Sequence, residues 1–494
     1  MTPLIPVHFP SRIVTAGVIL VAGWLLIMPA VAQQGDVPAG DSAMAELAAL
    51  DSAQPTLREL PSLPGLFQRA LEHDSALARQ RYELEAVNEE IPLARSQLLP
   101  QVSANASYLY QDSTNIQTDP DGFGLDQPAQ RPGEIDERYW QLQLQQPLFS
   151  LERWRGLDLA RAQVSVAQLQ LALVERDLAL EVSEAYINAY LASRRLGLLE
   201  AQRESLELQT RQAQRAFDLG VGDRINLLEA QSRLDQSISD TVQAENEFDN
   251  ALSLLERLTG MRPDFSGLQL GSLEAAKVES DWGSVDAWIE RTPANLQVLL
   301  AREEQRTNEF DTRIRRGGHF PEVNLNLSYS DRDSDDDLRT SEDYRASVEV
   351  SVPLYRGGYT TASVRQGELR TSAARESVTN ELNLAAQEVR QRLRSLNGSV
   401  RQLEALRQAI ESSQLFLDAA ERGEQLGLRD LVDVLDARAN LFDQRIRFVD
   451  TIGIYAIDWL ALRSAVGELN SADLNNIMAL LARITTPGSV EGES

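Results

Sequence analysis

The stretch LGVGDRINLLEA, residues 219–230, returns 207 residues later as LGLRDLVDVLDA, residues 426–437. In both copies a Leu-Gly pair ends one helical pattern, and a second helical pattern follows it. Two upstream segments also repeat: Gln146-Pro147-Leu148-Phe149 matches Val352-Pro353-Leu354-Tyr355, and Leu99-Pro100-Gln101-Val102 matches Phe320-Pro321-Glu322-Val323. The order of these matches predicts two tandem repeats, each running helix, strand, strand, long helix, tip and helix.

Each repeat is predicted to contain a pair of strands with alternating side chains. In residues 321–331, Val323, Leu325 and Leu327 alternate with Asn324 and Asn326, and residues 343–352 alternate in the same way. Weaker alternation marks residues 101–112 and 138–146. Runs of about 10 residues fit tilted strands across a bilayer, although a soluble hairpin with one face on a core would alternate too. Four strands cannot close a membrane barrel, which needs about 8, so a barrel would combine several chains.

Four prolines flank the predicted strands. Pro100 and Pro321 stand before the first strand of each repeat, and Pro147 and Pro353 stand after the second. Proline lacks a backbone N–H and has a fixed φ, so it interrupts both helices and strands. We therefore expect all four prolines to turn the chain between strand and helix.

Long heptad patterns follow the strands. From Gly156 to Leu219 an apolar residue recurs at every seventh position, beginning with Leu157 and Val164. The segment from Thr361 to Leu426 has a similar composition and no proline. A strict heptad over this length predicts coiled-coil-like packing of long helices. The expected fold class is therefore mostly α with a small β part, and the helices could form an open cylinder or a filled bundle.

The composition excludes several classes of function. The 494 residues include 47 Lys+Arg and 74 Asp+Glu, a formal net charge of −27, so phosphate backbones would repel the chain and nucleic-acid binding is not expected. There is no cysteine, which excludes disulfides and thiol nucleophiles. The histidines, His8, His73 and His319, are scattered, so no metal centre is predicted. No motif pairs a carboxylate with a nucleophile, so we predict neither an enzyme nor a cofactor.

The N-terminus has the pattern of a secretory signal peptide. Arg12 is followed by the apolar run from Val18 to Ile27, and then by the small residues Ala30-Val31-Ala32. Cleavage is expected after Ala32, which would export the mature chain. A retained anchor helix is the alternative, but the apolar run is shorter than the ~20 residues that span a bilayer.

In the order of its two repeats, the chain resembles the outer-membrane efflux (TolC) family, from about Pro64 to Leu469. The resemblance rests on the strand-to-helix segments, on the two Leu-Gly tips and on the endings Leu258-Thr259-Gly260 and Ala465-Val466-Gly467-Glu468-Leu469. It implies a homotrimer in which three chains of four strands make one 12-stranded outer-membrane β-barrel, continued by a periplasmic α-helical barrel. The implied function is the exit duct of an efflux or type I secretion system. The implied partners are outer-membrane lipid, a periplasmic adaptor protein and an inner-membrane transporter.

The resemblance also assigns roles to residues near the tips. Asp433 and Asp436 are similar to the aspartates that ring the periplasmic entrance and favour cations, although carboxylates are favourable in the first turns of any helix. Arg429 is similar to an arginine that holds the entrance closed. The family's partners of that arginine are replaced here by Asn226 and Glu424, which become its candidate contacts. The turns that dock the adaptor correspond to Gly220, Val221, Gly222, Asp223, Gly427, Leu428 and Asp430.

The predicted organisation divides the chain into six parts. They are a signal peptide (1–32), a linker (33–60), the first repeat (61–260, tip 219–223), an irregular equatorial segment (261–283), the second repeat (284–469, tip 426–430) and an irregular C-terminal equatorial segment with a tail (470–494). A soluble periplasmic coiled-coil scaffold is the alternative function, because heptads alone do not require a membrane. The cargo is not visible in the sequence.

Overall fold

The computed structural model describes residues 60–112, 134–265, 268–270, 278–335 and 339–487. The chain divides into two units, 1–57 and 58–494, and all of the described residues belong to the second. The expected signal peptide and nearly all of the expected linker therefore lie outside the described residues. Within them helix predominates, accompanied by a four-stranded sheet and a two-stranded one, which confirms the mostly α fold class.

The helices follow the two repeats. The first repeat contains α2 (Leu63–His73), α3 (Ser75–Asn88), α4 (Glu90–Ser96), α5 (Leu151–Asp218) and α6 (Arg224–Thr259). The second contains α7 (Val285–Ile289), the 3-10 helix η2 (Thr292–Ala294), α8 (Leu296–Gly317), α9 (Tyr359–Gln425) and α10 (Leu431–Ala465), and α11 (Ser471–Arg483) follows. No helix in the described ranges combines the length and the apolar character that crossing a membrane requires.

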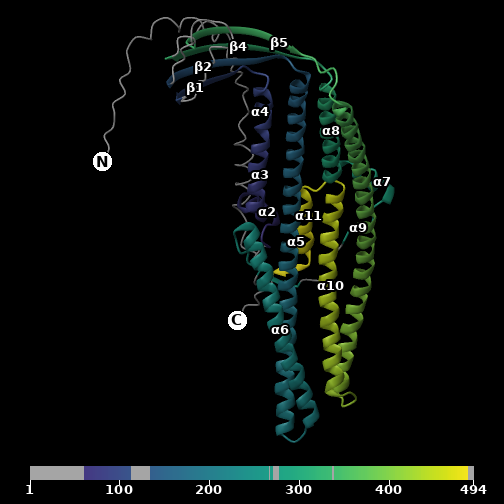
Figure 1. Cartoon of the computed structure of the whole chain (residues 1–494). Coiled ribbons are helices and arrows are strands. Elements are labelled where there is room, and N and C mark those ends of the chain that lie inside the picture. The colour runs from purple at the N-terminus through teal and green to yellow at the C-terminus, as the bar shows by residue number, and fades with distance from the viewer. Residues whose placement is uncertain (1–59, 113–133, 266–267, 271–277, 336–338, 488–494) are drawn as a thin grey trace, which may run out of the picture. The chain divides into compact units, whose positions relative to one another are not determined.

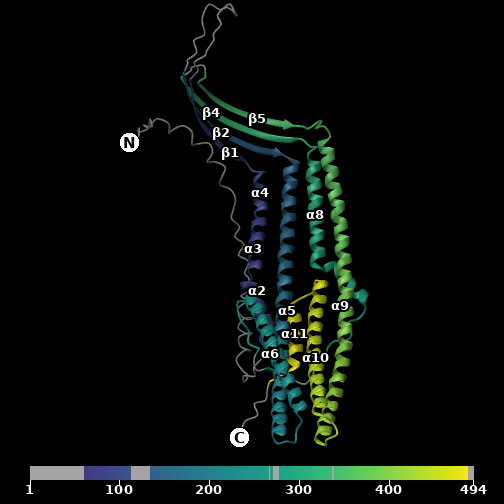
Figure 2. The ribbon, with the colours of Figure 1, turned by 60° about the horizontal axis from the view of Figure 1, so that its bottom comes forward.

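In each repeat, shorter helices pack in succession along one long helix. The long helices are α5, with 68 residues, and α9, with 67. Along α5 lie first α3 and α4 and then α6, whereas along α9 lie first α8 and then α10 (Figures 1 and 2). α8 and α10 also contact α5, so the two repeats pack side by side.

The sheet joins the two repeats. Its strands are β1 (Gln101–Asp112), β2 (Glu134–Phe149), β4 (Glu322–Ser334) and β5 (Ser341–Ser351), in the order β1-β2-β4-β5 with every pair antiparallel. β2 and β4 come from different repeats and pair in the centre. Two further short strands, β3 (Leu268–Leu270) and β6 (Thr485–Pro487), pair with each other.

The register of the sheet gathers the apolar side chains on one face. Residues directly opposite one another on neighbouring strands share a face of the sheet. Two successive apolar rows are Ala104, Leu142, Tyr329, Tyr344 and Val102, Leu144, Leu327, Ala346. Between them, on the opposite face, runs the polar row Ser103, Gln143, Ser328, Arg345. The alternation seen in each strand separately is therefore continuous across all four.

Pro147 does not turn the chain, contrary to the prediction. β2 continues through it to Phe149, and its register with β4 shifts between Pro147 and Phe149. A proline is tolerated at such a bulge because the ladder of hydrogen bonds is already interrupted there. α5 instead begins after Ser150, whose hydroxyl accepts the Arg153 N–H at 3.4 Å. The other three prolines, Pro100, Pro321 and Pro353, lie in the connections between helix and strand.

The prediction of an irregular segment after residue 470 was wrong for α11. Its N-terminus is closed by a capping box, in which Asn470 and Asp473 bond each other's backbone N–H. Leu474, Ile477 and Leu481 follow at helical spacing and are buried. The signal was present in the sequence as a cap residue followed by an amphipathic run.

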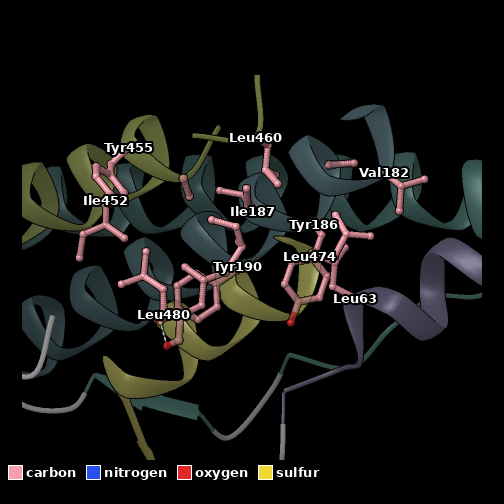
Figure 3. Packing of buried hydrophobic residues seen from close by; sticks show 14 of the residues in the cluster. Leu63, Val182, Tyr186, Ile187, Tyr190, Ile452, Tyr455, Leu460, Leu474 and Leu480 are labelled. Carbon is pink, nitrogen blue, oxygen red and sulfur yellow. Dashed lines mark hydrogen bonds between the residues drawn. The ribbon is translucent and has the colours of Figure 1, made fainter. Parts of the chain in front are cut away.

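The largest core forms where α11 and α2 pack onto α5 and α10, as Figure 3 shows. Tyr186 and Tyr190 of α5 are fully buried there. Their hydroxyls donate to the Pro61 carbonyl at 2.8 Å and the Leu481 carbonyl at 3.3 Å. Burial raises the pKa of Tyr186 above its ordinary value, so the phenol stays protonated. These bonds fix both terminal segments of the unit to the middle of α5.

Two adjacent leucines of α6 test this core. Leu255 is fully buried, whereas Leu254 is 37% exposed. Leu255→Ala is expected to lower the free energy of unfolding by about 2–5 kcal/mol through the cavity that it leaves. Leu254→Ala is the matched control and is expected to cost less than about 1 kcal/mol. Denaturant titration followed by circular dichroism measures both, and equal losses would contradict the packing.

Candidate functional site

The two tips have the same backbone construction. At the first, Gly220 has a φ of +74°, and the N–H groups of Val221 and Gly222 donate to the Ala216 carbonyl at 3.0 and 2.9 Å. At the second, Gly427 has a φ of +69°. A residue with such a φ ends a helix in the left-handed conformation, which glycine adopts without strain.

The corresponding bonds at the second tip converge on Gly423. The N–H groups of Leu428 and Arg429 donate to its carbonyl at 2.8 and 3.3 Å. With the repeat offset of 207, Gly423 stands at the position of Ala216, and Arg429 at the position of Gly222. At the first tip the second of these two positions is glycine, and at the second tip the first of them is glycine.

This difference has a steric reason. A Cβ added to Gly222 would lie 2.8 Å from the Ala216 Cβ, and a Cβ added to Gly423 would lie 3.1 Å from the Arg429 Cγ. At the first tip the added Cβ would also lie 2.9 Å from the Ala216 C and the Phe217 N, so the backbone itself requires glycine at 222. At the second tip Gly423 makes room for the Arg429 side chain. Sequence reasoning identified Gly222 and Arg429 but missed Ala216 and Gly423, although the repeat alignment pairs them.

Both tips expose apolar side chains. Leu219 and Val221 at the first tip are 78% and 81% exposed, and Leu426 and Leu428 at the second are 73% and 78% exposed. The backbone glycines Gly220 and Gly427 are exposed as well. Asp223 accepts the Ile225 N–H at 3.3 Å and so caps α6, while Asp430 holds the N-cap position of α10. The residues expected to dock a partner thus lie in two solvent-facing turns, of which the first is capped by a side chain.

Asp433 and Asp436 lie on the exposed side of the first turns of α10. Val434 and Ala437 beside them are buried. Asp433 Oδ2 lies 3.6 Å from Arg429 Nη1, and Asp436 Oδ1 lies 2.8 Å from Arg233 Nη2. Each aspartate of the expected ring therefore faces an arginine within the single chain.

Within the single chain, Arg429 has a partner other than the two expected ones. In the described chain its guanidinium pairs with Asp433 and lies 5.4 Å from the centroid of the Phe416 ring, and neither Asn226 nor Glu424 bonds to it. Asp433 is four residues further along, on the helix that starts just after Arg429, so it lies within reach of that side chain.

Two arginines that the sequence analysis did not single out connect the two helical hairpins that end at the tips. One hairpin is α5 with α6, and the other is α9 with α10. Arg233 of α6 bonds Asp436 of α10. Arg438 of α10 donates to Glu421 of α9 and to Ser205 of α5. These bonds connect α5 and α6 to α9 and α10 close to the tips.

The close approach at the first tip gives a test. Gly222→Ala is expected to destabilise the turn by about 1–3 kcal/mol, because the new Cβ overlaps both the Ala216 side chain and the backbone of residues 216 and 217. Proteolysis tracks the population of the opened turn, so trypsin should cleave after Arg224 about fivefold faster or more. Adding Ala216→Gly removes only the side-chain overlap, because the new Cβ still lies 2.9 Å from the Ala216 C and the Phe217 N, so the rate should fall only in part. Gly156→Ala is the control, because a Cβ there meets nothing within 4 Å, and equal rates for all variants would contradict the geometry.

Comparisons with known proteins agree with this construction. The family model for the outer membrane efflux protein matches residues 66–261 and 293–468. The outer membrane protein TolC of Vibrio cholerae is 28% identical over 425 residues, covering 85% of this chain and 93% of that protein. The alkaline protease secretion protein AprF of Pseudomonas aeruginosa is 27% identical over 428 residues, covering 85% and 87%.

A solved structure shares the fold. The CmeC outer membrane channel of Campylobacter jejuni superposes with a TM-score of 0.69 at 16% identity, covering 89% of this chain and 95% of that one. The two matched segments of the family model span both repeats, from α2 through α10. This chain belongs to the outer membrane efflux protein family.

Proposed function

We propose that this chain works as a homotrimer, in which three four-stranded sheets close into one 12-stranded outer-membrane barrel and form the exit duct of a tripartite efflux or type I secretion system. The observation that carries the proposal is the continuous apolar face of the sheet. On it, Val102, Tyr344, Val348 and Val350 are exposed by 63%, 78%, 60% and 60% in the single chain. An apolar face of this extent needs a cover, and lipid provides one.

The edges of the sheet argue for several chains. Among the described strands, β1 and β5 each pair on one side only, and both are exposed along their whole length. Unpaired backbone groups are too costly inside a bilayer, so the edges must meet other strands. Two chains would supply about 8 strands, whose barrel is filled by its own side chains. Three chains would supply 12 and leave a passage.

Aromatic rings support the placement of the sheet in a membrane. The centroids of Trp140 and Tyr329 lie 4.9 Å apart, and those of Tyr329 and Tyr344 lie 4.6 Å apart, so one ring from each of three strands contacts the ring on the next strand. Carboxylates beside them accept bonds, as in Trp140 Nε1 to Asp331 at 3.1 Å and Tyr329 to Glu342 at 2.9 Å. Rings with an apolar body and a hydrogen-bonded polar end suit the boundary between lipid and water.

The helices and tips then extend into the periplasm, after removal of the signal peptide near Ala32. The exposed apolar tips of both repeats are the surface that a periplasmic adaptor would cover, and the adaptor would connect the duct to an inner-membrane transporter. One relative is named for alkaline protease secretion, which fits the secretion role. The duct itself supplies a passage, and the transporter selects the cargo.

A soluble coiled-coil scaffold is a weaker explanation. It would leave the apolar face and both edges of the sheet in water, where such edges promote aggregation. The heptads of α5 and α9 are explained by either function, so they do not decide between them.

Membrane fractionation tests the proposal. The protein is expected in the outer-membrane fraction, where an unboiled gel sample should run near three times the monomer mass and collapse to the monomer on boiling. Val348→Arg places a charge on the apolar face, at a cost of about 2–4 kcal/mol in lipid, and should reduce the trimer band. Ser347→Arg, on the opposite face of β5, is the matched control and should leave it unchanged. A soluble wild-type monomer would contradict the proposal.

A further inference from the structure

One guanidinium lies between two carboxylates that are equivalent in the two repeats. Arg233 Nε lies 2.9 Å from Glu229 Oε1, and Arg233 Nη2 lies 2.8 Å from Asp436 Oδ1. Glu229 and Asp436 differ by the repeat offset of 207, and the neighbouring pair Asn226 and Asp433 differs by the same number.

The equivalence extends to the packing around these residues. Leu227 and Ala230 of α6 are buried, and so are Val434 and Ala437, their equivalents on α10. Equivalent faces of α6 and α10 are therefore buried in the two hairpins. Glu229 then occupies on α6 the position that Asp436 occupies on α10.

We propose that Arg233 determines both the charge and the closure of the entrance, and that Glu229 is a third acidic residue of the aperture. The inference rests on the proposed trimeric duct, because only an assembled aperture has a selectivity to set. It adds two residues, Arg233 and Glu229, to the aspartates Asp433 and Asp436.

The charge of the aperture follows from the ion pairs. Each chain contributes the carboxylates Asp433, Asp436 and Glu229 and the guanidinium groups of Arg429 and Arg233. Three negative charges against two positive ones leave a net charge of −1 per chain. The aspartates alone would contribute −2, so the arginines moderate the preference for cations.

The same arginine restrains the two hairpins. α9 and α10 are held together near their tip by the apolar cluster Leu417, Ala420, Val434, Ala437 and Leu441. Arg233 bonds across from α6 to α10, between hairpins. Arg233 and Asp436 are 41% and 57% exposed, so the bond is weak and screened by salt. A bond of this kind can break when the hairpins separate and form again when they return.

Charge and restraint can be separated by substitution. Arg233→Gln removes the bond and changes the net charge per chain from −1 to −2. Asp436→Asn changes it to 0. Combining Arg233→Gln with Asp436→Asn returns the charge to −1 without the ion pair. Arg447→Gln is the matched control, because Arg447 pairs at 3.0 Å with Asp443 of its own helix, α10.

Single-channel recordings in planar lipid bilayers measure both effects. Arg233→Gln is expected to raise the cation-to-anion permeability ratio about twofold or more and to raise the conductance. Asp436→Asn should lower the ratio. The combined variant should keep the wild-type ratio and the raised conductance. Arg447→Gln should change neither.

Arg233→Lys tests the restraint alone, because this substitution keeps the positive charge. Lysine keeps the charge but cannot hold both carboxylates in one planar fork, so the ratio should stay at the wild-type value while the conductance rises. Heat-modifiable trimers show that each variant assembles.

The outcomes distinguish this inference from the proposed function. A wild-type protein that forms no channel would overturn both. Wild-type channels together with Arg233 and Asp436 variants that retain the wild-type ratio and conductance would overturn this inference alone. An Arg233→Gln variant that fails to assemble would leave the decision to Arg233→Lys and Asp436→Asn, for which unchanged values would likewise overturn it.

Discussion

The unpaired edges of the four-stranded sheet are the constraint on which the rest depends. A strand edge in lipid has no water to satisfy its N–H and C=O groups, so a sheet that spans a bilayer, as we propose for this one, must close. The single chain cannot close it, because β1 and β5 stand at the two edges of the described sheet. In the proposed duct, assembly therefore precedes function, and β2–β4 pairing between the repeats fixes how each chain presents its edges.

The tandem repeat gives the two tips the same backbone structure with different side chains. Both tips use a left-handed glycine and a carbonyl that accepts two N–H groups, yet the paired side chains differ, with Ala216 and Gly222 at one and Gly423 and Arg429 at the other. The second tip thereby gains an arginine that pairs with Asp433. Divergence between equivalent positions thus places charge on one repeat while the backbone remains the same.

Local patterns in the sequence predicted the helices and strands well, but they did not predict the contacts between residues far apart in the chain. Alternation indicated where the strands lie, because strand periodicity is a local property. It could not reveal that β2 pairs with β4, since register depends on residues far apart in the chain. Pro147 was misassigned because a bulge accepts a proline that a regular strand would reject. Arg233 was missed because Asp436 is 203 residues away, although the equivalence of Glu229 and Asp436 was visible in the repeat.

The most direct test of the shared barrel joins the free edges of neighbouring chains. The chain has no cysteine, so Asn105→Cys on β1 and Ser347→Cys on β5 introduce the only thiols. Treatment of membranes with a flexible bis-maleimide is expected to give covalent dimers and trimers from the double variant and monomers from each single variant. A double variant that stays monomeric, in membranes where both thiols react with a monofunctional maleimide, would contradict the shared barrel.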